Sequence, residues 1–319
     1  MSGSGVPRHT GGLPDFSRAK YTNGLTATKS SDVGVARPGQ GIRDAYLDTL
    51  TSVWRLMQCL GCGSVDRARK KWSGLPFFAC ASCGVLFVYP QASDAQLDQA
   101  YRERYYPAAG GASAIYENTP RQLVEQLVSC LRDHGFLPSR DGRVLDFGCG
   151  VGDFADAAAR HGAEVDAVEA DAVARALATR RGVRAYSGLA DIPRERRSRQ
   201  YDLIALLDVL EHVRDPLAVL TALRALMRPG GALYLSVPNH RAPQPRLLGA
   251  RWDQATNPTH LFLFSPRSVR LLLGRAGFVG SYLPCAFRDP RMNAPQRACS
   301  VLLQHLRLSA TLRFVARAV

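Results

Sequence analysis

The chain has 319 residues, of which 46% are hydrophobic, and it carries a formal net charge of +14. This length and hydrophobic content suit one large domain with a smaller companion, and they exclude a chain that is disordered throughout. No stretch reaches the roughly 20 apolar residues of a membrane span, and the N-terminus lacks a signal-peptide core, so we expect a cytoplasmic protein without a transmembrane segment.

The positive charge comes almost entirely from arginine, because Lys20, Lys29, Lys70 and Lys71 are the only lysines. A basic chain can indicate nucleic-acid binding. The arginines are dispersed, however, and we interpret the one dense run, residues 194–199, as a solvated loop. Nucleic acid is therefore not the partner we expect, and no pattern indicates an oligomeric state.

The first 90 residues contain a predicted disordered tail and a metal-site pattern. Residues 1–40 are rich in Gly, Ser, Thr and Pro without apolar periodicity, which is typical of disorder. Within residues 53–90, the spacing C-x2-C-x17-C-x2-C predicts a zinc ribbon in which four thiolates close a structural site. Its ligands would be Cys59, Cys62, Cys80 and Cys83. The alternative is a pair of reduced turns that hold no metal. In a reducing compartment we expect the other four cysteines to be unpaired as well.

Residues 91–118 read as a helical linker or lid, in which Ser93 caps a helix running toward Arg104. From residue 119 to 319, strand and helix patterns alternate, as in a doubly wound sheet. Residues 238–265 form a long insertion at the rim of that sheet, which favours a functional lid. Residues 294–308 predict an amphipathic helix, which we expect to pack on the sheet rather than to touch a membrane surface.

A glycine-rich turn follows the first predicted strand of this region, residues 143–147. Gly148, Gly150 and Gly152 alternate there, so the backbone can turn tightly and a ligand can lie against its N–H groups. Asp146 precedes the turn, where a carboxylate would repel a pyrophosphate but would suit a ligand that carries a positive charge. The next strand ends at Glu169, which is placed to accept hydrogen bonds from ribose hydroxyls.

These residues resemble the class I S-adenosylmethionine (SAM) methyltransferases. The resemblance extends in order and spacing through 201–204, 208–213, 229–231 and 236–239, and it is strongest to the branch that includes the ubiquinone-pathway enzymes. It implies a Rossmann-like α/β fold, with a seven-stranded, mostly parallel sheet, helices on both faces and an antiparallel last strand. It also implies a SAM-dependent methyltransferase acting on a small-molecule or glycan acceptor of a biosynthetic pathway.

The resemblance also assigns expected roles to individual residues. Tyr105 or Tyr106 would fold over the methyl donor, and Asp191 is a weaker candidate for the adenine amino group. His212 and His260 are the candidate general bases, because imidazole titrates near neutral pH; either could instead be a structural histidine. The SAM-binding residues would be Asp146, Gly148, Cys149, Gly150, Glu169, Leu189, Ala190 and Asp208.

Three rival functions are weaker on the residues present. An RNA or DNA methyltransferase acting on base amino groups would carry an Asp/Asn-Pro-Pro-aromatic motif, whereas this chain has Asp208-Val209-Leu210-Glu211. A dehydrogenase is disfavoured because the glycines follow G-x-G-x-G rather than G-x-G-x-x-G. A non-catalytic SAM-fold protein is disfavoured by the intact donor motif.

Overall fold

The computed structural model describes residues 59–65, 67–68, 77–88, 91–105, 120–138, 141–198, 200–283 and 285–319. The predicted tail, residues 1–40, and Tyr106 lie outside the described residues. The strands are β1 (Arg67–Ala68), β2 (Phe77–Cys80), β3 (Leu86–Val88), β4 (Arg143–Phe147), β5 (Glu164–Val168), β6 (Ala185–Tyr186), β7 (Tyr201–Leu207), β8 (Met227–Pro238), β9 (Phe262–Leu263), β10 (Phe278–Tyr282) and β11 (Thr311–Ala318).

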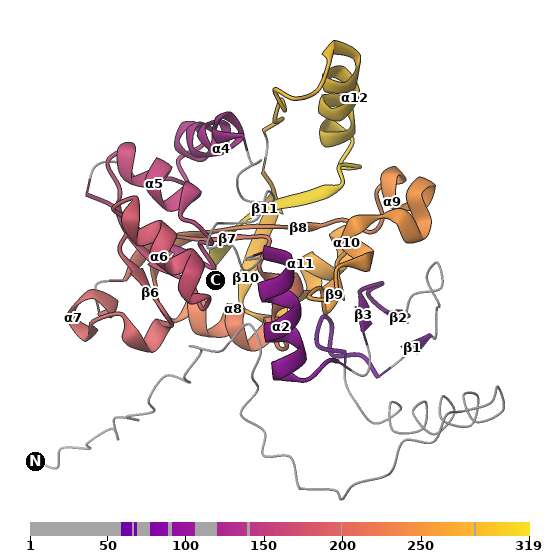
Figure 1. Cartoon of the computed structure of the whole chain (residues 1–319), viewed down its shortest axis with the longest axis horizontal. Helices are drawn as coiled ribbons and strands as arrows, with labels where there is room; N and C mark the ends of the chain where they lie inside the picture. The colour runs from indigo at the N-terminus through magenta and orange to yellow at the C-terminus, as the bar shows by residue number, and fades with distance from the viewer. Residues whose placement is uncertain are drawn as a thin grey trace, which may run out of the picture.

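Helices connect these strands in alternation with loops (Figure 1). The α-helices are α2 (Asp94–Tyr105), α4 (Arg121–Asp133), α5 (Asp153–Arg160), α6 (Ala172–Arg180), α7 (Arg194–Arg197), α8 (Pro216–Arg224), α9 (Pro243–Leu248), α10 (Asp253–Thr256), α11 (Pro266–Arg275) and α12 (Ala294–His305). Short 3-10 helices are η1 (Leu189–Asp191), η2 (Leu210–His212) and η3 (Gly249–Arg251).

The large sheet has seven strands in the order β10-β11-β8-β7-β4-β5-β6. Neighbouring strands from β8 to β6 pair in parallel, whereas β11 pairs antiparallel with both β8 and β10. The predicted α/β fold with an antiparallel last strand is therefore confirmed. The order reverses between β4 and β7, and ligands of open α/β sheets gather beyond the carboxyl ends of strands at such a point.

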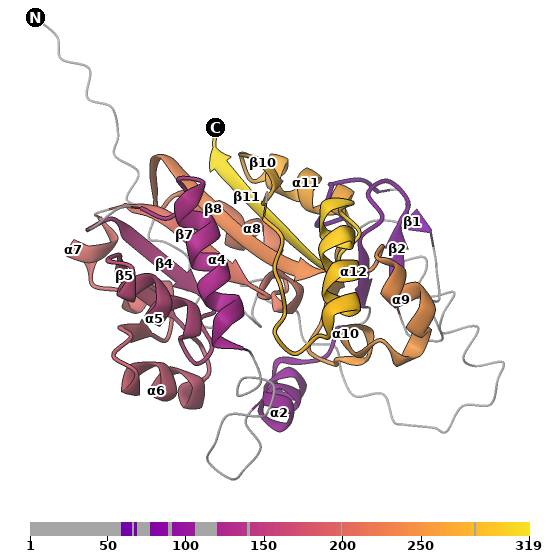
Figure 2. The same ribbon diagram turned by 90° about the horizontal axis from the view of Figure 1, so that it is seen from above.

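Both faces of the sheet are buried, which explains the continuous apolar run in β7. Leu203 and Ala205 face the core shared with α4 and α5, whereas Ile204 and Leu206 face the core shared with α8 and α11. Successive side chains of a strand point to opposite faces, so a strand covered on both sides must be apolar throughout. The view from above shows these helices on the two sides of the sheet (Figure 2).

A second, four-stranded sheet has the order β1-β2-β3-β9 and joins the cysteine segment to the predicted lid. β3 pairs antiparallel with β9, through Leu86 with Leu263 and Phe87 with Phe262. The segment 238–265 is therefore not one irregular loop. It contains α9, α10 and β9, and β9 is one of the two edge strands of the sheet that carries the cysteines.

The structure corrects two expectations. Helix α12 does not pack on the sheet, since none of its residues is buried and Leu302 and Leu306 are more than half exposed. Cys130 and Cys285 are not unpaired, because a disulfide joins α4 to the segment after β10. Both differences arise because the segment between β10 and β11 leaves the sheet and passes beside α4.

The described helices include none with the length and apolar character that a membrane span requires.

Candidate active site

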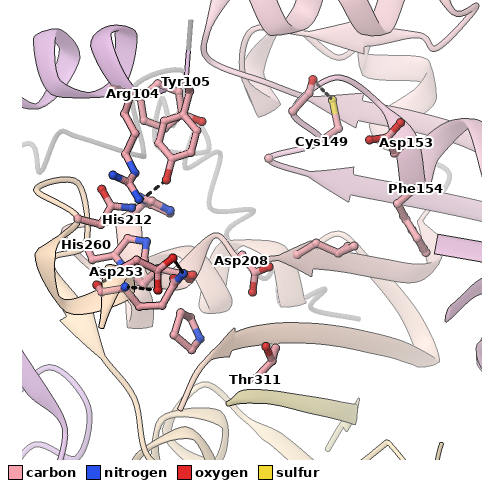
Figure 3. A pocket seen from close by; sticks show the side chains of 18 of the residues that line it. Arg104, Tyr105, Cys149, Asp153, Phe154, Asp208, His212, Asp253, His260 and Thr311 are labelled. Atoms are coloured by element: carbon pink, nitrogen blue, oxygen red, sulfur yellow. Dashed lines mark hydrogen bonds between the residues drawn. The ribbon is translucent and has the colours of Figure 1, made fainter. Parts of the chain in front are cut away.

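A cavity of about 610 Å³ lies beyond the carboxyl ends of β4, β7 and β8 (Figure 3). Several chain segments contribute to it: the glycine turn after β4, the turn after β7, helix α2, and the lid segment between β8 and β9. The predicted residues that line it are Asp146, Gly148, Cys149, Gly150, Asp208, His212 and His260. The tertiary structure thus brings together both candidate bases and most of the residues assigned to SAM.

The glycine turn takes backbone conformations that side chains rarely adopt. Gly148, Gly150 and Gly152 have φ values of 80°, 55° and 85°. A Cβ atom on Gly148 would lie 2.6 Å from a methyl carbon of Val209, so glycine is required there on two grounds. The turn also brings the backbone against the first residues after β7, which closes one side of the cavity.

The N–H groups of this turn are not bare, contrary to the sequence-based expectation. Gly148 and Cys149 both donate to the carbonyl of Val168, at 2.7 and 3.0 Å. Gly150 donates to a carboxylate oxygen of Glu169 at 2.9 Å. These hydrogen bonds hold the turn against the end of β5, so the loop is organised before any ligand arrives.

Glu169 is fully buried and acts as the second anchor of the turn. Its other carboxylate oxygen accepts from the backbone N–H of Asp171 at 2.9 Å. A carboxylate has about four lone-pair sites, so each oxygen retains capacity for a hydroxyl donor. Glu169, Leu189 and Ala190 do not line the main cavity; Leu189 is buried and Ala190 is exposed. Asp191 accepts a hydrogen bond from Ser187.

Two carboxylates stand at the cavity end of the sheet. Asp146 is 1% exposed at the end of β4, and Asp208 follows β7 with a φ of 52°, a strained conformation for a residue with a side chain. Ser236 donates to Asp208 at 3.0 Å. The walls of the cleft remove water from Asp208 and raise the pKa of its carboxyl, while the Ser236 hydrogen bond opposes that change.

The two histidines pack edge to face, with ring centroids 4.6 Å apart. Nδ1 of His212 lies 3.1 Å from the carbonyl of Thr259, and Nδ1 of His260 lies 2.8 Å from the carbonyl of Gln254. A carbonyl oxygen only accepts, so each Nδ1 carries the hydrogen. Nε2 is then the acceptor nitrogen of each neutral ring.

Burial, with a smaller contribution from the positive charge of Arg104, lowers the pKa of His260 to about 3, although the Gln254 hydrogen bond opposes this change. A lowered folded-state pKa means that the unfolded chain binds the proton more readily as the pH falls below about 6.5. The contribution of His260 to the free energy of unfolding is therefore fully present above pH 6.5 and is lost as the pH falls toward 3. We expect about 2 kcal/mol of this stability to be lost at pH 5.

Urea unfolding of the wild type and His260→Asn at pH 7 and pH 5 measures this effect. The asparagine amide can still donate to the Gln254 carbonyl, so the variant should lose about 2 kcal/mol less than the wild type on acidification. His305→Asn, on the exposed end of α12, is the matched control and should keep the wild-type acid sensitivity. Equal losses in the wild type and His260→Asn would contradict the assignment.

Helix α2 forms the wall of the cavity opposite the glycine turn. The rings of Tyr101 and Tyr105 each lie 6.2 Å from the His212 ring, edge to face. The Tyr105 hydroxyl accepts a hydrogen bond from Nδ2 of Asn257 at 2.9 Å, so this helix directly contacts the segment 238–265. Sequence reasoning placed Tyr105 near the donor but missed Arg104 and Gln254, which also line the cavity. Neither belongs to a motif, so no local pattern could have found them.

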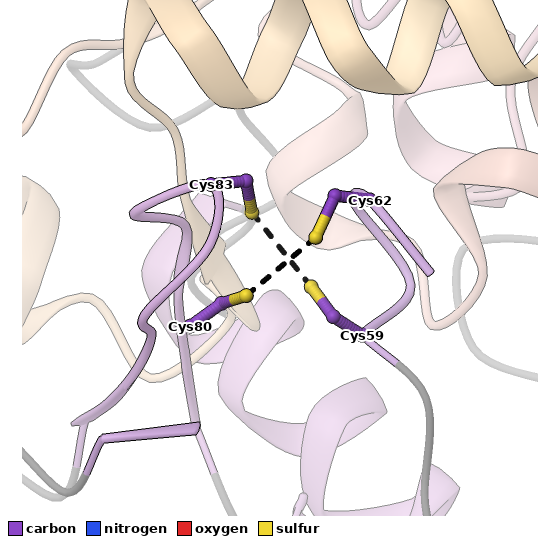
Figure 4. A group of neighbouring side chains, drawn as sticks. All are labelled: Cys59, Cys62, Cys80 and Cys83. Atoms are coloured by element: carbon purple, nitrogen blue, oxygen red, sulfur yellow. Dashed lines mark hydrogen bonds between the residues drawn. The ribbon is translucent and has the colours of Figure 1, made fainter. Parts of the chain in front are cut away.

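The four cysteines of the predicted zinc ribbon converge on one centre (Figure 4). The sulfurs of Cys59 and Cys83 are 3.8 Å apart, and those of Cys62 and Cys80 are 3.6 Å apart. Sulfurs arranged tetrahedrally about zinc at about 2.3 Å are separated by about 3.8 Å, so the spacing fits this ion. A hydrogen bond from the Cys83 thiol lowers the pKa of Cys59 to about 5, which favours a thiolate there.

The cysteine turns are attached to the large domain at several points. Arg275 of α11 donates to the carbonyls of Cys59 and Leu60 at 3.2 and 2.9 Å. His240 donates through Nε2 to the carbonyl of Gly84 at 2.8 Å. Together with the β3–β9 pairing, these contacts place the cysteine centre directly behind the lid that carries His260.

Comparison with known proteins gives these features a family context. Residues 117–281 match the family described as "Methyltransferase domain". A ubiquinone biosynthesis O-methyltransferase of Cereibacter sphaeroides is 38% identical over 155 residues, which are 44% of this chain and 62% of that protein. The corresponding enzyme of Aeromonas salmonicida is 38% identical over 112 residues, or 33% of this chain and 47% of that protein. The chain thus spans less than two thirds of the length of these relatives.

Solved structures of methyltransferases are also similar to this chain, at low sequence identity. A magnesium protoporphyrin IX methyltransferase from Synechocystis, solved with bound SAM, is 19% identical with a TM-score of 0.41 and covers 70% of this chain and 91% of that chain. A SAM-dependent methyltransferase from Thermotoga maritima is 17% identical with a TM-score of 0.44, covering 64% and 96%.

Proposed function

Because the chain belongs to the class I SAM-dependent methyltransferase family, we propose that it transfers the methyl group of SAM to a small-molecule or glycan acceptor of a biosynthetic pathway. The observation that supports this most is the cavity itself. It places a glycine turn with two carboxyl groups on one side and two imidazoles on the other. One wall suits a cationic donor, and the opposite wall suits an acceptor that must lose a proton.

The residues present fit SAM. In their ionised forms, Asp146 and Asp208 would place negative charge at the end of the sheet, where it would favour the ammonium of the donor. Glu169 would accept from the ribose, and Leu189 and Ala190 would contact adenine. When bound, SAM supplies an electrophilic methyl group that needs no further activation. The protein therefore contributes mainly by positioning the acceptor, which can account for about 7–11 kcal/mol of a barrier.

We propose His212 as the general base. Its Nδ1–H is held by the Thr259 carbonyl, so in the neutral ring Nε2 carries no hydrogen and can take the acceptor proton. His260 stays neutral because burial keeps its pKa near 3, and it is accordingly a weaker base. Its Nε2 would serve as a hydrogen-bond acceptor that orients the acceptor molecule.

We also propose that residues 53–90 form a zinc-stapled module, with Cys59, Cys62, Cys80 and Cys83 as ligands, and that residues 91–118 close the cavity as a lid. The zinc would be structural, since four sulfurs leave no open position. The sulfur spacing and the contacts of Arg275 and His240 support this arrangement. Residues 119–319 would form the methyltransferase domain.

Two measurements test the proposed function. Calorimetry with SAM and with S-adenosylhomocysteine should show one saturable site per chain. Incubation of the protein with a metabolite extract and SAM labelled in its methyl group should then yield a product shifted by one labelled methyl in mass spectrometry. Absence of donor binding would contradict the function, and labelling of RNA alone would favour the nucleic-acid alternative.

We expect Glu169→Ala to weaken SAM binding by about tenfold to a hundredfold. The variant removes a charged hydrogen bond to the ribose, worth about 1.5–3 kcal/mol, and leaves the Gly150 amide without its acceptor. Calorimetry measures the affinity. Glu169→Gln keeps one carbonyl acceptor and should lose less, and Glu195→Ala, on exposed α7, should bind SAM as the wild type does. Unchanged affinity in Glu169→Ala would remove Glu169 from the site.

A further inference from the structure

Arg104 is the one arginine or lysine among the described residues that line the cavity. It is the penultimate residue of α2, and Figure 3 shows its side chain extending into the cavity beside the rings of Tyr105, His212 and His260. The guanidinium carbon lies 6.0 Å from the centre of the Tyr105 ring, a distant cation–π contact.

No carboxylate neutralises this guanidinium within the part of the chain that the structure describes. Its Nε is buried without a hydrogen-bond partner, and it forms no ion pair at 4.0 Å or less. By contrast, Arg196 and Arg214 are paired with Asp166 and Asp94, at 2.9 and 2.7 Å. Arg104 as a whole is half-buried, but a buried Nε–H without an acceptor is destabilising, so a ligand that supplied an acceptor in the cavity would stabilise this arginine.

The acidic residues that line this wall form no ion pair with Arg104 in the part of the chain that the structure describes. Both carboxylate oxygens of Asp253 accept from Gln254, through its backbone N–H at 2.9 Å and its amide at 3.0 Å. Glu211 is fully buried and forms no ion pair with Arg104 at 4.0 Å or less in the described structure. Asp146 and Asp208 belong to the opposite side, at the ends of β4 and β7.

Helix α2 holds Arg104 firmly in this position. At the start of the helix, Arg214 donates to the Asp94 carboxylate at 2.7 Å and to the Ala92 carbonyl at 2.6 Å. At its end, Tyr105 is hydrogen-bonded to Asn257 and packs against His212. A cation whose backbone is fixed at both ends loses little freedom when an anion binds, which favours affinity.

We propose that Arg104 makes this wall an oxyanion-binding subsite, and that the methyl acceptor is an anionic molecule whose carboxylate or phosphate Arg104 holds. This inference rests on the proposed function and specifies its substrate class. The planar guanidinium presents donors that match two oxygens of a carboxylate or phosphate. The two sides of the cavity then suit ligands of opposite charge. The cationic donor faces Asp146 and Asp208, and the anionic acceptor faces Arg104.

The position of Arg104 also explains how the acceptor would meet the base. Its positive charge is close enough to His260 to contribute to the low pKa of that ring. An anion held at Arg104 therefore lies beside both imidazoles, and the rest of the acceptor can present a hydroxyl or amine to Nε2 of His212. The proton passes from that nucleophile to His212 as the new bond to the methyl carbon forms and the bond from that carbon to the donor sulfur breaks.

The test uses the full chain saturated with S-adenosylhomocysteine and three matched probes, namely benzoate, phenyl phosphate and neutral benzamide. Calorimetry should show binding of at least one anion and at least about tenfold weaker binding of benzamide. Arg104→Gln should weaken the anion by about tenfold to a hundredfold, the range expected for a charged hydrogen bond. Arg104→Lys should retain part of the affinity. The tighter of the two anions identifies the carboxylate or the phosphate class.

Arg102→Gln is the matched control, since Arg102 lies two residues before Arg104 on the same helix and is exposed. It should leave anion binding unchanged. All variants should bind S-adenosylhomocysteine as the wild type does, so a failure of donor binding would count against the proposed function alone. Equal binding of benzamide and benzoate, binding of neither anion to the wild type, or full anion binding by Arg104→Gln would overturn the proposal.

Discussion

Replacing Cys80 and Cys83 together with serine is expected to abolish zinc binding and to reduce methyl transfer by at least about a hundredfold. Structural zinc contributes about 10–16 kcal/mol to the folding of small cysteine modules, far more than β1, β2 and β3 can supply alone. Because β3 pairs with β9, loss of the module would release the lid segment that carries His260. SAM affinity should change much less, since Asp146 and Glu169 lie on the large sheet.

Zinc content by mass spectrometry, the melting temperature, and the rate of methyl transfer to the acceptor found by labelling together measure this result. Cys299→Ser is the matched control, because Cys299 is exposed on α12 and is not one of the four cysteines that converge. A double variant that lacks zinc yet keeps its rate would show that the module has no part in the active site. Equal zinc content in variant and wild type would instead exclude these cysteines as ligands.

Gly148→Ala is expected to destabilise the fold by about 2–5 kcal/mol and to weaken SAM binding strongly. Two costs combine in this estimate of magnitude. A residue with a Cβ at φ 80° costs about 1–2 kcal/mol. Overpacking against Val209, at 2.6 Å, adds about 1–3 kcal/mol. Relief of that clash would displace the turn and, with it, the Gly150 amide held by Glu169.

Gly182→Ala separates these two contributions. Gly182 has nearly the same φ, 84°, but nothing lies within 4 Å of the position that its Cβ would take. It should therefore show the backbone cost without the steric one and should bind SAM normally. Denaturant unfolding and calorimetry provide the comparison. If the two variants lose the same stability and Gly148→Ala still binds SAM, the turn does not depend on its approach to Val209.

Local features of this protein were predictable from sequence because they depend on neighbours in the chain. The apolar run of β7 indicates a strand buried on both faces, and the glycines after β4 indicate a tight turn with positive φ. The spacing of the cysteine pairs likewise predicted the convergence of four sulfurs. Asp146, Asp208 and His212 could be placed near one another because the carboxyl ends of parallel strands meet at one edge. His260 was expected there from its place in the insertion and from the family resemblance.

Other features were decided by contacts between distant segments. The N–H groups of the glycine turn are taken by Val168 and Glu169, which no pattern in the turn reveals. Arg104 reaches the cavity because α2 is fastened by Arg214 and Asn257. That no described carboxylate pairs with it is visible only when the neighbouring side chains are placed. In each case the chemistry depends on which surface a segment finds, and not on its own periodicity.

The sequence by itself determined the glycine turn and the cysteine centre, since short-range spacing encodes them, and its motifs carry the family resemblance that implied the seven-stranded sheet. Only the tertiary structure decided that β9 of the lid pairs with β3, that α12 stays off the sheet, and that a disulfide joins Cys130 to Cys285. These outcomes depend on which edges and faces remain uncovered after the central sheet forms, a property of the whole fold that local pattern does not carry.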